Sequence, residues 1–405
     1  MANAADAYTG AVLKGKQYTF ERIPYQIVWQ EESKIKETYA GRNNYVIIDG
    51  FHHKPDATAP KSDAVLIFMH PAGITTNLAI CHALPKMGIP VLCAVARYPK
   101  NDTALIMEKV AVDLGQHVKY AREVLGYKYV ILAGWSGGGS LSMFYQSEAE
   151  KPEITHTPAG DVYSLVDAKL MPADGVIQVA THVSRAHIMT EMMDVSFADE
   201  TKPDERDPSL DLFGGQVKPP YGQEFFQKIR KLQIERNKRI DDYVFNMLDF
   251  LKKSPRGELE RGFMVHGTRS DPTLFDTTLD PNDRAVEELN ALGNPAEVNM
   301  GPSGLARYSC LRSWLSQWSY VHSRVHSPTN AKKVTVPILV VENTADDICM
   351  ASHPQRIWAA VKDKKDAQYK QIKGATHYYF DQPEKLQESA TNFMTWMREH
   401  KWINF

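Results

Sequence analysis

The sequence predicts an α/β protein whose mostly parallel central sheet is flanked by helices. Three observations carry this prediction. Short apolar runs alternate with amphipathic segments over residues 62–180, one run ends in a Gly-x-Ser-x-Gly motif, and the alternation returns at residue 335 after a long interval. Strands and helices that alternate in this way indicate parallel βαβ units within one sheet.

The first part of the chain supplies most of the expected elements. Residues 18–28 and 44–51 read as antiparallel strands, since glycine and proline punctuate them. Continuous apolar runs, typical of strands buried on both faces, follow at residues 64–69, 91–96, 130–133 and 175–180. Helices are expected at residues 78–87, 103–125 and 141–150.

The segment from residue 181 to residue 334 differs in composition from the rest of the chain. It is polar, rich in methionine and aromatic residues, and contains one long amphipathic stretch at residues 223–253. It is too long for a simple crossover between strands. We therefore expect a core made of residues 1–180 and 335–405, with residues 181–334 inserted as a mainly helical cap.

The end of the chain returns to the strand and helix pattern. A strand is expected at residues 336–342, a helix at 354–361, a strand at 369–372 and a last helix at 383–400. Polar turns follow both strands, and each turn carries an ionisable residue that could take part in chemistry.

Composition narrows the class of partner. The net charge of −2 favours neither nucleic acid nor a membrane surface, and no run reaches the length of a membrane span. The four cysteines are scattered and the N-terminus lacks a signal-peptide pattern, so we expect a cytoplasmic protein with reduced thiols. No phosphate loop or metal motif occurs, which predicts a small-molecule substrate with no cofactor and no metal. The oligomeric state stays open, a homo-oligomer included.

The motif Gly134-Trp135-Ser136-Gly137-Gly138 lies between an expected strand and an expected helix. A chain that reverses sharply at Ser136 needs flanking residues with little or no side chain. The turn would expose the hydroxyl at the sheet edge, with the Gly137 N–H at the start of a helix, where it could stabilise an oxyanion. The alternative is a merely flexible glycine loop.

Two further residues complete a pattern. Asp346 follows the strand at residues 336–342, and His377 ends the sequence Gly374-Ala375-Thr376-His377 after the next strand. The order Ser136, Asp346, His377 resembles the α/β-hydrolase superfamily. The resemblance covers residues 62–180 and 334–400. Asn343 replaces the usual glycine of the acid turn, and the cap matches nothing in the family.

The resemblance implies a role for each residue. Ser136 would be the nucleophile, His377 its base and then the acid for the leaving group, and Asp346 the residue that orients His377. One oxyanion donor would be the Gly137 N–H. The second would come from the loop after the strand at residues 64–69, as the N–H of Ala72 or Gly73.

Several assignments have rivals. Asp347 neighbours Asp346, and residues 264–271 also resemble a strand and an acid turn that ends at Asp271, although over 100 residues would then separate Asp271 from His377. His377 itself could be a surface histidine at a strand end. His70 could orient the oxyanion loop through its ring, or it could be a buried histidine whose partners are backbone groups.

Aromatic residues suggest an apolar substrate pocket. We expect its candidates to be His70, Trp135, Trp314, Trp318 and Tyr378, because such rings bind apolar surface. Trp314 and Trp318 are one helical turn apart, so packing of the cap against the core explains them at least as well and is the default interpretation.

Taken together, the residues and the resemblance predict a serine hydrolase that forms an acyl-enzyme on an ester, lactone or thioester with an apolar or aromatic part. Amide or carbon–carbon bond hydrolysis on the same triad is the nearest alternative, followed by haloperoxidase-like chemistry. A non-catalytic ligand-binding protein on the same fold is the alternative of another class.

Overall fold

The computed structural model describes residues 13–33, 35, 37, 44–286 and 290–405. The first twelve residues, on which the expectation about a signal peptide rests, lie outside this range. An eight-stranded sheet organises the chain in the order β1-β2-β4-β3-β5-β6-β9-β10. Its strands are β1 (Phe20–Gln30), β2 (Tyr45–Pro55), β3 (Ala64–His70), β4 (Val91–Val95), β5 (Tyr129–Trp135), β6 (Gly175–Val179), β9 (Ile338–Asn343) and β10 (Ala367–Ile372).

The sheet is parallel except at one edge. β1 pairs with β2, and β2 with β4, in antiparallel fashion, whereas all other neighbouring strands are parallel. Parallel strands have their carboxyl ends along one edge, so the loops after β3, β5, β6, β9 and β10 gather there. This edge is where ligands bind in open α/β sheets.

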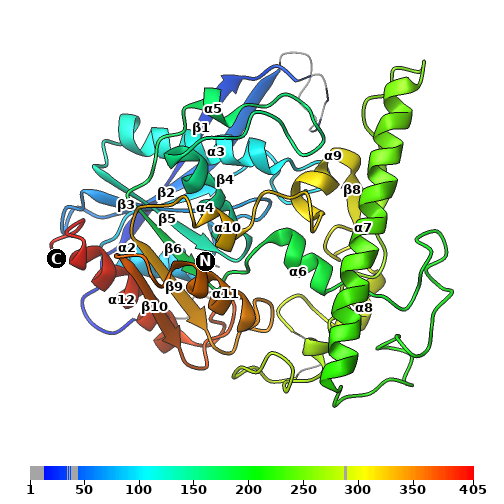
Figure 1. Cartoon of the computed structure of the whole chain (residues 1–405). Coiled ribbons are helices and arrows are strands. Elements are labelled where there is room, and N and C mark those ends of the chain that lie inside the picture. The colour runs from blue at the N-terminus through cyan, green and yellow to red at the C-terminus, as the bar shows by residue number, and fades with distance from the viewer. Residues whose placement is uncertain (1–12, 34, 36, 38–43, 287–289) are drawn as a thin grey trace, which may run out of the picture.

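Helices cover both faces of the sheet, which explains the continuous apolar runs of its central strands. On one face, α2 (Ala79–Lys86) and α12 (Pro383–Glu399) share an apolar core with Leu66, Phe68 and Ile131. On the other face, α3 (Met107–Lys119) and α4 (Gly137–Glu150) pack on Val65 and Leu132. α10 (Ser327–Asn330) and α11 (Ser352–Val361) extend that second layer beside β6 and β9 (Figure 1).

Two helices differ from the sequence prediction by more than two residues at one end. The segment expected at residues 103–125 forms α3 followed by a π-helical turn, η1 (Tyr120–Val124). The helix expected at residues 141–150 begins earlier, at Gly137, because the glycines after Ser136 are already helical. The second difference matters for function, since it places Ser136 directly at the N-terminus of α4.

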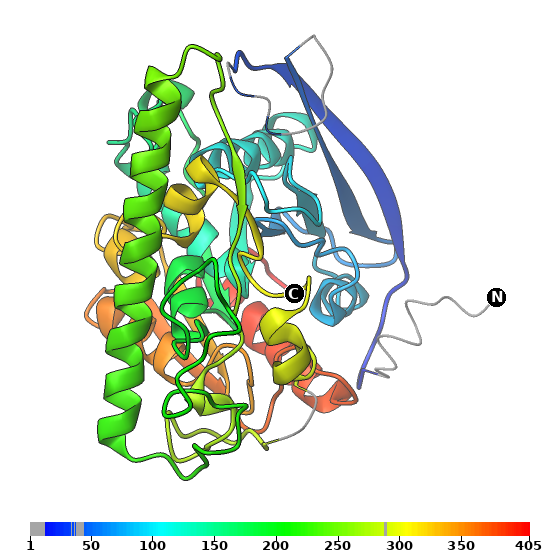
Figure 2. The same cartoon turned by 90° about the vertical axis from the view of Figure 1, so that its right-hand side faces the viewer.

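The residues between β6 and β9 form one long helix and several short elements. α7 (Gln223–Lys253) has the bounds expected from its periodicity and lies along the outside of the molecule (Figure 1). The remaining elements are α6 (Arg185–Glu191), β7 (Gly262–Met264), η2 (Pro272–Leu274), α8 (Pro295–Met300), β8 (Tyr308–Cys310), α9 (Leu311–Ser313) and η3 (Trp314–Trp318). Figure 2 shows α7 on one side of the molecule and the β1–β2 pair on the other.

The inserted segment has an apolar core of its own. Met189 of α6, Ile240 and Val244 of α7, and Trp314 and Trp318 of η3 are all buried in it. Much of the chain between these elements has no regular secondary structure, so hydrophobic periodicity could not predict its short strands and turns. Within the described residues, no helix combines the length and the apolar character needed to cross a membrane.

Candidate active site

Ser136 lies at a strained turn between β5 and α4. Its φ is 54°, a left-handed value that costs a non-glycine residue about 1–3 kcal/mol. A Cβ on Gly134 would lie 2.4 Å from the Cα of Gly139, and one on Gly138 would lie 2.3 Å from the carbonyl oxygen of Met69. Glycine is therefore required at these positions, and the turn holds the serine hydroxyl above the carboxyl edge of the sheet.

Asp346 and His377 form a buried pair beside this turn. The Nδ1 atom of His377 is 2.7 Å from Oδ2 of Asp346, and each side chain is only 1% exposed. The other oxygen, Oδ1, accepts hydrogen bonds of 2.8 Å from the N–H groups of Ile348 and Cys349. The carboxylate is thus fixed on two sides, so the hydrogen bond to Oδ2 places the proton on Nδ1 and leaves Nε2 able to accept one.

Cys349 lies next to the Asp346–His377 pair, and the sequence analysis missed it. Its sulfur, a His377 ring nitrogen and an Asp346 oxygen lie within 4.8 Å of one another, and the Ser136 hydroxyl lies near the thiol. Burial and the nearby Asp346 carboxylate raise the pKa of this thiol well above its usual value. A position three residues after the acid gives no motif by which sequence reasoning could have found it.

Trp135 joins the nucleophile turn to the histidine loop from the other side. Its indole N–H donates to the carbonyl oxygen of His377 over 3.2 Å, and the two rings are 4.7 Å apart. The residue before Ser136 in the chain therefore contacts both the ring and the backbone of His377. Ser136, Asp346 and His377 thus gather at the same edge of the sheet, around Trp135 and Cys349.

Asn343, which departs from the family pattern, supports the histidine loop. Its side-chain amide donates to the carbonyl oxygen of Thr376 over 2.8 Å and accepts from the hydroxyl of Tyr379 over 3.0 Å. The asparagine therefore ties the end of β9 to the residue that precedes His377. This contact gives the departure a structural purpose.

The rival acids lie elsewhere. Asp271 makes two contacts with Arg230, of 2.8 and 3.0 Å, and caps η2 through the N–H of Thr273. Asp347 accepts from the N–H of Ala291 over 2.8 Å, and burial raises its pKa. Of these three carboxylates, only Asp346 is hydrogen-bonded to His377.

The loop after β3 differs from the arrangement predicted for the oxyanion site. The N–H groups of Ala72 and Gly73 donate to Nδ1 of His70 over 3.2 and 2.6 Å. These N–H groups are the two candidates for the second donor, and both already have a partner. Burial, Arg185 and His377 together lower the pKa of His70 to about 3, so its imidazole is neutral.

The expected pocket residues separate into two groups. Trp135 and Tyr378 lie at the site with ring centroids 5.1 Å apart, and Tyr378 packs with Ile188, Met192 and Cys349. Trp314 and Trp318 are fully buried within the inserted segment. The Trp314 indole donates to Asp241 of α7 over 2.7 Å, and the Arg185 guanidinium lies over Trp318 at 4.4 Å, so both rings serve packing.

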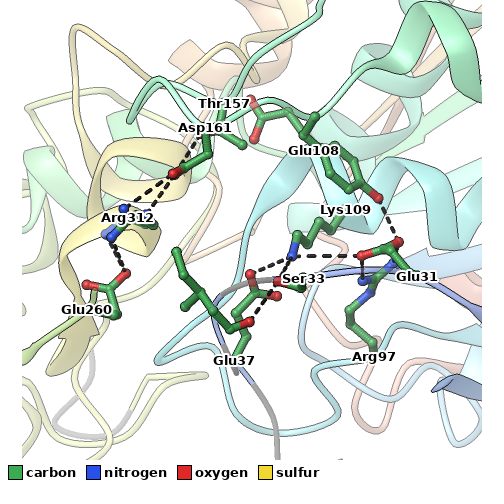
Figure 3. Close-up of polar contacts among 12 residues, drawn as sticks. Glu31, Ser33, Glu37, Arg97, Glu108, Lys109, Thr157, Asp161, Glu260 and Arg312 are labelled. Atoms are coloured by element: carbon green, nitrogen blue, oxygen red, sulfur yellow. Dashed lines mark hydrogen bonds and ion pairs between the residues drawn. The ribbon is translucent and has the colours of Figure 1, made fainter. Parts of the chain in front are cut away.

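A cavity of about 450 Å³ lies away from these residues, beside α3 and the segment after β1. Figure 3 shows that its cations already face carboxylates. Lys109 lies 2.5 Å from Glu37, and Arg312 lies 2.7 Å from Asp161 and 3.6 Å from Glu260. Because these cations are already paired with carboxylates of the protein, the cavity is a poor candidate for a catalytic site. We therefore place the candidate active site at the turn of Ser136.

The sheet order and these residues together define the α/β-hydrolase fold. The turn of Ser136 follows β5, Asp346 follows β9 and His377 follows β10, in the order that the fold requires. No protein-family model matches the chain, and no curated protein matches it either.

Solved structures with the same fold are similar to the chain at low identity. Est1E from Butyrivibrio proteoclasticus is 13% identical over 86% of this chain and 94% of its own, with a TM-score of 0.44. The monoacylglycerol lipase of Paleococcus ferrophilus is 15% identical over 87% and 99%, with a TM-score of 0.41. MenH from S. aureus is 12% identical over 86% and 98%, with a TM-score of 0.41.

Proposed function

We propose that this protein is a serine hydrolase that cleaves carboxylic esters, lactones or thioesters through an acyl-enzyme on Ser136. The observation that carries the proposal is the geometry at the carboxyl edge of the sheet. Ser136 stands on a strained turn next to Trp135, whose indole contacts His377, and Nδ1 of that histidine lies 2.7 Å from the buried carboxylate of Asp346. This is the arrangement by which a weakly nucleophilic hydroxyl is activated near neutral pH.

The residues act in two stages. His377 accepts the proton of Ser136 at Nε2 while the serine oxygen attacks the substrate carbonyl carbon. The Asp346 carboxylate stabilises the imidazolium that results, and the Gly137 N–H at the N-terminus of α4 donates to the oxyanion. His377 then protonates the leaving alcohol. In the second stage water replaces the serine, and the same groups release the acid.

We propose further that residues 181–334 act as a cap over this site and select an apolar substrate. Ile188 and Met192 come from this segment, and they pack against Cys349 and Tyr378 at the site. Apolar and thioether side chains adapt to acyl chains and rings, which favours an apolar acyl or alcohol part. Amide and carbon–carbon bond hydrolysis use similar residues and differ in how the leaving group is protonated.

The test is hydrolysis of p-nitrophenyl esters of graded acyl length. Wild type should be active, Ser136→Ala and His377→Ala should lose turnover, and Asp271→Asn should serve as the matched control with kcat unchanged. The acyl length with the highest kcat/KM measures the pocket. Full activity in Ser136→Ala would overturn the proposal.

The binding-protein alternative makes a different prediction for the same panel. An idle triad would leave wild type inactive towards every ester and would leave Ser136 unreactive towards a fluorophosphonate. An inactive wild type whose Ser136 is still labelled would instead move the proposal from simple esters to amide or carbon–carbon substrates, with thioesters retained, since the nucleophile would then be competent.

A further inference from the structure

His70 lies between the two segments that border the expected oxyanion site. Its Nδ1 atom accepts the N–H groups of Ala72 and Gly73, at 3.2 and 2.6 Å. On its far side, a Cβ placed on Gly137 would lie 2.7 Å from Nε2 of the same ring. The imidazole therefore occupies the space between the loop after β3 and the residue that follows the nucleophile.

The hydrogen bonds at Nδ1 assign the tautomer of His70. An Nδ1 atom that accepts N–H bonds carries no proton, so a neutral imidazole must carry its proton on Nε2. Burial, together with the nearby Arg185 and His377, lowers the pKa of the ring to about 3. The imidazole is therefore neutral at any pH near neutrality. His70 thus presents a fixed Nε2–H donor.

Nε2 is the atom of His70 nearest to the Cβ position of Gly137, so this donor faces the turn after Ser136. Among the described residues, no side chain or backbone group accepts a hydrogen bond from Nε2, although the ring is deeply placed. The residue is nevertheless partly exposed. A second buried histidine, His182, has its Nε2 3.5 Å from the same Cβ point on Gly137, so polar groups converge on this spot.

We propose that the Nε2–H of His70 is the second oxyanion donor, acting beside the Gly137 N–H. The proposal rests on the proposed hydrolase function. It replaces the backbone donor expected from sequence, because the N–H groups of Ala72 and Gly73 are directed at the imidazole and hold it in place. The loop after β3 would then act on the substrate through a side chain that its own backbone orients.

Two substitutions separate an oxyanion donor from a residue that only orients the loop. His70→Asn places a carbonyl oxygen near the position of Nδ1, which keeps an acceptor for the loop and removes the Nε2–H. His70→Gln places an amide nitrogen near the position of Nε2, which keeps the donor and removes the acceptor. Loss of one oxyanion donor typically lowers kcat by about 10²–10³-fold.

We expect kcat of His70→Asn to fall by about 10²–10³-fold with little change in KM. His70→Gln should retain a larger fraction of the wild-type kcat. Affinity for a trifluoromethyl ketone, which forms an oxyanion on Ser136, should fall by the same factor as kcat/KM in His70→Asn. The reverse order, with His70→Gln the weaker enzyme, would mean that the ring only orients the loop and would overturn the proposal.

A measurement on wild type keeps the proposal testable if a variant fails to fold. Nitrogen-15 NMR of the histidine rings should show His70 protonated at Nε2, with its proton moving downfield when the ketone adduct forms. Protonation at Nδ1, or a proton unmoved by a formed adduct, would overturn the proposal. Absence of any adduct on Ser136 would instead refute the hydrolase function, and with it any oxyanion donor.

Discussion

Replacement of Asp346 by asparagine should abolish most of the activity without unfolding the protein. Oδ1 of Asp346 accepts two backbone N–H groups at 2.8 Å, which an amide nitrogen cannot do. The asparagine oxygen must therefore stay at that position, and its NH₂ group must face Nδ1 of His377 at the place now occupied by Oδ2. Nδ1 can then only accept, so the ring proton moves to Nε2.

An imidazole protonated at Nε2 cannot take the proton of Ser136. In a hydrolase with the same triad, this wrong tautomer lowers kcat by about 10⁴-fold. At about 1.36 kcal/mol for each factor of ten, a loss of 10³–10⁴ corresponds to roughly 4–5.5 kcal/mol in the barrier. Hydrogen bonds to both sides of residue 346 persist, so thermal stability should change little.

The assay is steady-state hydrolysis of a p-nitrophenyl ester by Asp346→Asn, with Asp347→Asn and Asp271→Asn as matched controls. Both controls remove a carboxylate that does not contact His377 and should keep kcat close to wild type. A kcat in Asp346→Asn within tenfold of wild type would refute the tautomer argument. So would a larger loss in either control.

Three other outcomes follow from the same contacts. Cys349→Ala should keep esterase activity, because a thiol whose pKa is raised stays protonated and does not act as a nucleophile. Loss of acylation in this variant would contradict that view. Gly139→Ala should destabilise the protein by about 1–3 kcal/mol or more in urea unfolding, because the new Cβ would lie 1.9 Å from Oγ1 of Thr181. An unchanged midpoint of the urea unfolding curve would be the contrary result. Burial lowers the pKa of His117 to about 4, so below about pH 6.5 the unfolded chain gains a proton that the folded one refuses. Stability should therefore fall by about 3 kcal/mol from this residue as the pH drops from 6.5 to 4, and His117→Asn should flatten that part of the pH profile.

Periodicity and motif order were sufficient for the sheet and for the triad residues as candidates. The continuous apolar runs at β3, β4, β5, β6 and β9 are a direct consequence of burial on both faces, and α7 has the bounds that its apolar spacing indicates. The turn at Ser136 depends on the glycines next to it in the chain, so a short stretch of sequence is enough to predict it.

Contacts between distant segments were beyond the reach of the sequence. The choice of Asp346 over Asp347 depends on how the chain turns after β9, and the approach of Cys349 to Ser136 depends on the same turn. The bond between Trp314 and Asp241 joins residues on two different helices, so the role of that indole could be weighed but not decided.

The loop after β3 shows the same limit in a different way. The resemblance placed a backbone donor at Ala72 or Gly73, and only three-dimensional structure reveals that His70 already accepts both N–H groups. The sequence named His70 as a residue that could orient this loop, but it has no pattern that distinguishes this role from that of a buried histidine with backbone partners.

The central claim, that Ser136 is an activated nucleophile, is tested most directly by labelling with a fluorophosphonate followed by intact-mass and peptide analysis. We expect one adduct per chain, located on Ser136, formed in parallel with loss of esterase activity. The adduct should persist in Cys349→Ala and be absent from Ser136→Ala. An unlabelled wild type, or an adduct on Cys349 in place of Ser136, would contradict the account.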